Sequence, residues 1–162
     1  MKLYSFAAGL MLTVLAVLGL AGPAAAGEQV PFKGSLEGDV TVDPLTPPFV
    51  QVDVDADGNA TELGQFELDI PHVVNRAKGT AIGSYEFTAA NGDALFADFT
   101  GQSTPTATPG VLYIVEVATI TGGTGRFEGA SGSFTCERYF DLITDETFGS
   151  FEGTISRGHG KK

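Results

Sequence analysis

The 162-residue sequence has one cysteine, two histidines and only nine lysine and arginine residues. The single cysteine, Cys136, excludes an intrachain disulfide and leaves either a buried free thiol or an intermolecular bridge. The two histidines, His72 and His159, are too few for a three-histidine metal site, and neither stands in a motif that carries a nucleophile. Zinc chemistry and hydrolase triads are therefore not expected.

Basic residues are scarce. Without Lys2, 8 basic residues remain against 20 acidic ones, a net charge of −12. Nucleic acids and anionic lipid surfaces both require a basic footprint, so we predict neither as a partner. The glycines at 123 and 125 do not form a nucleotide motif, because Glu128 stands where a third glycine is required and no Gly-Lys-Ser/Thr follows. We predict no cofactor.

Residues 1–26 have the pattern of a signal peptide. A positive residue, Lys2, precedes an apolar run over 6–20, and small residues lead to a cleavage site between Ala26 and Gly27. The alternative is an uncleaved anchor, but the run is shorter than the ~20 apolar residues that span a bilayer. We predict a secreted or periplasmic protein with no membrane attachment after cleavage.

The rest of the chain alternates between apolar and polar side chains, which is typical of β-strands, and it contains no convincing helical segment. The expected strands cover residues 32–42, 50–54, 61–70, 81–89, 95–101, 111–120, 134–140 and 147–156. We predict one all-β domain over 27–157, an eight-stranded antiparallel barrel, followed by a polar tail over 158–162. A two-sheet sandwich is the structural alternative.

Turn signals separate these strands. Ala90–Asp93 contains Asn-Gly, a leading hairpin signal, and the glycine-dense stretch Ile120–Phe134 predicts a tight hairpin. Residues 55–59 are expected to form a turn, and 71–78 a loop that includes His72.

Three segments carry a family resemblance. Ala60–Phe66, Ala89–Asp93 and Ile120–Ala130 resemble a family of exported bacterial proteins of unassigned role. The Gly-Gly-Thr-Gly-Arg-Phe-x-Gly motif at 122–129 also resembles the hairpin of the calycin-like allene oxide cyclase and dirigent barrels. The resemblance covers most of 30–156 and implies an eight-stranded antiparallel barrel, often oligomeric, whose cavity holds hydrophobic substrates in the plant proteins. No catalytic residue of the cyclase is matched here.

The resemblance and the strand pattern favour a barrel that binds a small apolar molecule or serves as a structural and interaction module. An isomerase of the cyclase type, using the same cavity, is the enzymatic alternative and rests on the resemblance alone. The candidate cavity residues are the large apolar side chains on one face of the strands: Phe32, Leu36, Phe66, Tyr85, Phe87, Phe99 and Phe151.

The strand Val111–Ile120 is apolar on both faces, which indicates cover on both sides; the outer cover would be a loop, a helix or another subunit, the last giving a homo-oligomer through this segment. Its one charge, Glu116, is the candidate catalytic residue. A carboxyl group in the barrel interior would have a raised pKa and could act as an acid or base. The alternatives are an outward position or an ion pair with Arg126 or Arg138.

Asp53, Asp55 and Asp57 match the opening of an EF-hand calcium loop. The match ends at the twelfth position, where Gly64 replaces the required glutamate. We therefore expect a solvated turn and no metal, and weak calcium binding is the alternative.

Overall fold

The computed structural model describes residues 27–158. The predicted signal peptide over 1–26 and the last four residues of the predicted tail lie outside the described residues. The secondary-structure elements are β1 (Gln29–Pro44), β2 (Phe49–Ala60), β3 (Gly64–Asp69), β4 (His72–Asn75), β5 (Thr80–Ala89), β6 (Ala94–Pro105), β7 (Val111–Gly123), the short 3₁₀ helix η1 (Gly125–Phe127), β8 (Ser131–Asp141) and β9 (Glu146–Ser156). Within this part of the chain, no helix has the length and hydropathy to cross a membrane.

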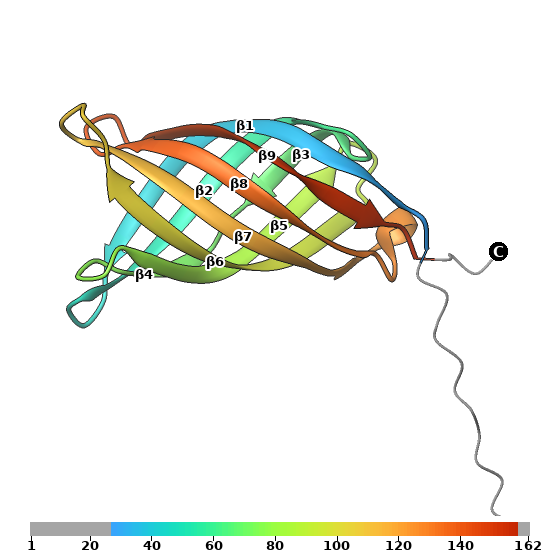
Figure 1. The fold of residues 1–162 in the computed structure, drawn as a ribbon, viewed down its shortest axis with the longest axis horizontal. Coiled ribbons are helices and arrows are strands. Elements are labelled where there is room, and N and C mark those ends of the chain that lie inside the picture. Colours follow the sequence, from blue (N-terminus) through green and yellow to red (C-terminus); the bar gives the residue numbers. More distant parts are fainter. Residues whose placement is uncertain (1–26, 159–162) are drawn as a thin grey trace, which may run out of the picture.

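The strands form one antiparallel sheet that closes into a barrel (Figure 1). Apart from β3 and β4, strands that are neighbours in sequence are neighbours in the sheet, and β1 closes it by pairing with both β9 and β2. β3 and β4 lie end to end in one position of the barrel, since both pair with β2 and with β5. The wall therefore has eight positions, and the predicted eight-stranded antiparallel barrel is confirmed.

The break between β3 and β4 corrects the loop predicted over 71–78. Pro71 has no N–H to donate to a ladder, so one ladder bond is missing there, although its carbonyl still accepts from the Ser84 N–H (3.2 Å). The register nevertheless continues across it, with Asp69 opposite Glu86 and His72 opposite Gly83. His72 consequently belongs to a strand of the barrel wall.

The turn predicted at 55–59 is also wrong. β2 runs through these residues to Ala60 and pairs with β1 along its length. The polar residues are compatible with a strand because the outer face of the wall is solvated. The actual turn lies at 61–63, where Glu62 has φ of +68°, and β3 starts only at Gly64.

The glycine-dense stretch forms a longer connection than the predicted tight hairpin. β7 ends at Gly123, and the chain makes the η1 turn before β8. Gly125 has φ of +56°, and a side chain there would collide with the carboxylate of Asp93. The backbone N–H of Arg126 donates to that carboxylate (3.3 Å), which ties η1 to the β5–β6 turn. Phe127 of η1 is fully buried, so the connection closes this end of the barrel.

Aromatic side chains fill the lumen next to this closed end. Neighbouring ring centroids lie 5.0 to 6.1 Å apart. The rings of this aromatic cluster belong to Phe32, Phe66, Tyr85, Phe87, Phe134 and Phe151. All six are buried at 4% exposure or less, and their contact geometry, mostly tilted or edge-to-face, is the one that aromatic pairs prefer.

Candidate functional site

The opposite end of the barrel encloses a cavity of about 550 Å³. We call it the open end; the connections 45–48, 76–79, 106–110 and 142–145 surround it, at the left of Figure 1. Much of the lining is aliphatic and comes from β1, β2, β4 and β7: Val40, Val50, Val52, Val74, Leu112 and Ile114. Alternation explains this lining, because every second residue of each strand points inward.

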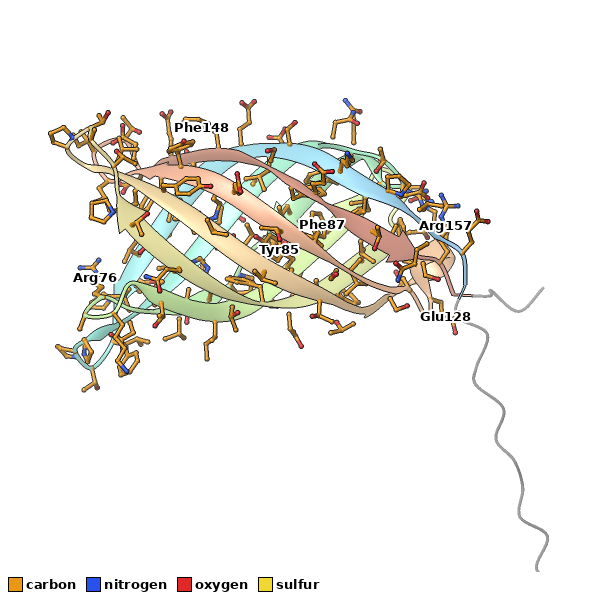
Figure 2. All side chains as sticks on the ribbon, in the orientation of Figure 1. Arg76, Tyr85, Phe87, Glu128, Phe148 and Arg157 are labelled. Carbon is orange, nitrogen blue, oxygen red and sulfur yellow. The ribbon has the colours of Figure 1, made fainter. Side chains whose placement is uncertain are left out.

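Five basic or polar side chains of different exposure join the lining, one of them the half-buried Ser103. Arg76 and Lys78 are exposed in the β4–β5 connection at the cavity mouth, and Figure 2 shows Arg76 at that end. His72 and Arg138 are buried, at 5% and 1% exposure. The cavity thus combines apolar walls with two buried polar groups.

Arg138 of β8 is held by Glu116 of β7. The Arg138 Nη2 donates to Glu116 Oε1 (2.8 Å) and its Nε donates to Oε2 (3.1 Å), a bidentate ion pair. The Tyr85 hydroxyl donates to the same carboxylate. Arg138 Nη1 donates to Thr147 Oγ1 (3.2 Å), which donates in turn to the carbonyl of Tyr139 (2.7 Å). This network fixes the guanidinium in place.

The pair is ionised at neutral pH. Burial by itself would raise the pKa of Glu116, but the charge of Arg138 and the hydrogen bonds from Arg138 and Tyr85 lower that pKa below its ordinary value. Burial alone would lower the pKa of Arg138, yet Glu116 raises it above its ordinary value. The two charges cancel. The buried polar part of the site that Arg138 and Glu116 form, which we call the polar floor, therefore carries no net charge.

His72 presents its ring to the lumen beside the ring of Phe99, at 5.6 Å between centroids. Its Nδ1 lies 2.8 Å from the carbonyl oxygen of Ile70. A carbonyl only accepts, so Nδ1 carries the hydrogen and Nε2 is the acceptor. Burial lowers the pKa of His72 below its ordinary value, which keeps the ring neutral. Gly83 allows this packing, because a Cβ there would collide with His72.

Cys136 of β8 lies two residues before Arg138, and its side chain faces inward as that of Arg138 does. Its side chain is fully buried and free, which agrees with the buried-thiol interpretation for a single chain. Burial raises the pKa of this thiol to about 12, so it is protonated and unreactive at neutral pH.

The seven predicted cavity residues all point into the barrel, but none is among those that line the cavity. Five belong to the aromatic cluster, and Figure 2 shows Tyr85 and Phe87 within the barrel. Leu36 and Phe99 are buried at 3% and 4% exposure. Alternation correctly predicts which side chains point into the barrel. The large rings fill the lumen where they contact one another, so the cavity lies at another level along the barrel axis.

Asp53, Asp55 and Asp57 lie on the exposed face of β2 and not in a loop. Asp55 stands between Asp39 and Asp69 of the neighbouring strands. Within residues 27–158, no group of three or more histidine, cysteine or acidic side chains is placed to hold a metal ion.

The outer face of β7 is apolar as the sequence indicates. Tyr113, Tyr139 and Phe148 form a row across β7, β8 and β9, with ring centroids 5.3 and 5.6 Å apart. Phe148 is 57% exposed and Val117 58% exposed; Figure 2 shows Phe148 at the outer surface. Self-association through Val111–Ile120 stays a prediction.

The sequence pattern does not predict His72 or Thr147 as site residues, and it predicts Arg138 only as an alternative partner of Glu116. The signal for His72 is the alternation Leu68, Ile70, His72, which continues past Pro71. Arg138 likewise shares its inward face with Cys136. Of the alternatives for Glu116, the ion pair with Arg138 is the one that forms.

These features define a class: a closed antiparallel barrel, packed at one end and hollow at the other, with a buried ion pair beside the hollow. No family model and no curated protein matches the sequence. Among solved structures, the chain is similar to the pterocarpan synthase dirigent protein GePTS1, with a TM-score of 0.57 and 12% sequence identity over 86% of this chain and 90% of that one. The similarity shows that this chain has the dirigent-type barrel fold, which confirms the resemblance at the level of fold.

Proposed function

We propose that this protein binds a small apolar molecule in the cavity at the open end of the barrel. The observation that carries the proposal is the contrast in filling: rings pack the lumen at the closed end, whereas about 550 Å³ remains free at the other. Cavities of a few hundred Å³ with mostly apolar walls and a few placed polar groups are typical of small-molecule sites.

The position of the cavity supports the same proposal. Exposed apolar side chains, Leu45 on the β1–β2 connection and Leu142 and Ile143 on the β8–β9 connection, stand at the mouth with exposures of 45%, 51% and 79%. An apolar ligand that enters between these connections exchanges water for aliphatic contacts, and the gain is about 25 cal/mol for each Å² of apolar surface buried.

The test uses N-phenyl-1-naphthylamine, a neutral apolar dye whose fluorescence rises when it leaves water. We expect saturable binding to the full-length protein. Val52 lines the cavity at 6% exposure, so Val52→Phe fills part of it and should weaken dye binding by about tenfold or more. The matched control is Val117→Phe, the same change at an exposed position of the outer wall.

Absence of saturable binding, or equal loss of binding in both variants, would contradict the proposal. Circular dichroism and the melting temperature of each variant report whether it has kept its fold, so that loss of binding by misfolding is recognised. The cyclase-type isomerase stays an alternative: incubation in which the bound molecule is converted, and not merely retained, would favour it.

A further inference from the structure

We propose that the cavity selects a neutral apolar molecule that carries a hydroxyl group, and that this hydroxyl donates a hydrogen bond to Nε2 of His72. The inference rests on the proposed function and names the chemical class of its ligand. Two buried polar side chains of the lining, His72 and Arg138, support it.

His72 provides an acceptor of fixed orientation. Its Nδ1–H is engaged by the Ile70 carbonyl, so the lone pair is on Nε2. Within residues 27–158, Nε2 has no hydrogen-bond partner. Every side-chain nitrogen or oxygen that is inaccessible to solvent in this part of the chain does have a partner, so Nε2 is not one of the inaccessible atoms. Nε2 is therefore accessible, and His72 lines both this cavity and a second hollow that Gln51 and Ile82 also line. A buried acceptor in this state selects a ligand with a hydrogen to donate.

Arg138 provides donors in the same lining. Three of the five guanidinium N–H groups are used, two on Glu116 and one on Thr147, which leaves two without a partner among the described residues. A hydroxyl both donates and accepts, so it matches a site that offers an acceptor on His72 and donors on Arg138. An ether or a ketone can only accept, and neither can use His72.

The charge balance selects against ions. Glu116 already neutralises Arg138, so a carboxylate bound beside them would be a buried charge without a counter-charge. A ligand ammonium would meet the guanidinium at close range and be repelled. Anions instead have the exposed Arg76 and Lys78 at the cavity mouth, outside the buried part of the site. The polar floor of the cavity thus fits a neutral polar group of a ligand.

Two isomeric ligands test the role of the hydroxyl. 1-Octanol and methyl heptyl ether have the same atoms and nearly the same apolar surface, but only the alcohol can donate. Each is titrated against the dye-loaded protein, with octanoate as the anionic comparison. We expect 1-octanol to bind about tenfold more tightly than the ether or octanoate, since a site with an unpaired polar group discriminates against ligands that leave it unpaired.

Variants at His72 assign the effect. His72→Phe keeps an aromatic ring and removes the acceptor, so the roughly tenfold preference for 1-octanol over the ether should disappear in this variant. His72→Gln restores a side-chain carbonyl acceptor and should recover part of the preference; it also serves if the phenylalanine variant fails to fold.

A spectroscopic readout separates direct contact from a structural role. In ¹⁵N-labelled protein, 1-octanol should move the His72 Nε2 resonance toward that of a hydrogen-bonded nitrogen, whereas the ether should not. If neither the dye nor any ligand binds, the proposed function itself fails. If the dye binds but alcohol and ether compete equally, or octanoate binds most tightly, the hydroxyl assignment is overturned and the cavity proposal stands.

Discussion

Apart from β3 and β4, which lie end to end, the two ends of the barrel are built from the same strands, yet one end is filled by aromatic rings and the other encloses a cavity of about 550 Å³. β1 contributes Phe32 to the closed end and Val40 to the open end, and β8 contributes Phe134 and then Arg138. The difference lies in side-chain volume and chemistry, not in the backbone. A continuous hydrogen-bonded wall can therefore support a packed core and a hollow in one lumen.

The ends also differ in how they are closed. At the closed end, η1 is bonded to the neighbouring connections: its Arg126 guanidinium donates to the carbonyl of Leu63 (3.0 Å) and the Phe127 ring is buried. The open end instead leaves Leu142 and Ile143 exposed. Stability should therefore depend most on the closed end, and ligand selection on the open end.

The largest expected effect comes from truncating the same residue type at each end. Phe87→Ala removes a fully buried ring from the aromatic cluster and should lower the free energy of unfolding by about 4 kcal/mol. Phe140→Ala removes a ring that already borders the cavity and should cost less, about 3 kcal/mol, because fewer contacts are lost. Denaturant titration measures both, and equal losses would contradict the distinction between the two ends.

The ion pair at the floor gives the next effect. Glu116→Gln leaves the buried charge of Arg138 without its partner and should lower the free energy of unfolding by about 3 kcal/mol. Replacing both residues, Glu116→Leu with Arg138→Met, removes the uncompensated charge and should restore much of the loss. A double variant no more stable than Glu116→Gln would indicate that Glu116 contributes mainly through Tyr85.

The smallest effect is a pH dependence from His72. Its ordinary pKa is 6.5 and burial lowers it in the folded protein, where Arg138, Glu116 and Asp53 are the charged groups that also act on it. As the pH falls below 6.5, the unfolded chain binds a proton that the folded protein does not, so stability decreases. We expect this loss of stability between pH 7 and pH 5 to disappear in His72→Gln, as measured by denaturant titration across that range.

Glu116 provides the control for this window. Its pKa is lowered in the folded state, so its contribution is present above its ordinary pKa of 4.5 and is lost only as the pH falls through more acidic values. A variant at His72 should therefore leave the acid side of the profile unchanged. Identical profiles between pH 7 and pH 5 for the variant and the parent would show that His72 is not buried as a neutral ring.

The sequence by itself determined most of the strands, their inward faces and the eight-stranded barrel, because alternation with a period of two is a local property of the chain. It also indicated that Glu116 is out of place on an apolar face. Local patterns predicted the wrong structure around Pro71 and at 55–59, where proline and turn-forming residues lie within the barrel wall. Pairing with distant strands, not local propensity, holds those residues in β-structure.

Only the tertiary structure decided where the lumen is filled and where it is free. The filling of the lumen depends on which inward side chains contact one another at the same level along the barrel axis. These residues are far apart in the chain, as Glu116 and Arg138 or His72 and Phe99 are. Rings from β1, β3, β5, β8 and β9 converge at the closed end, so the cavity lies among smaller side chains at the open end. The ladder register that brings them together is a property of the closed barrel as a whole.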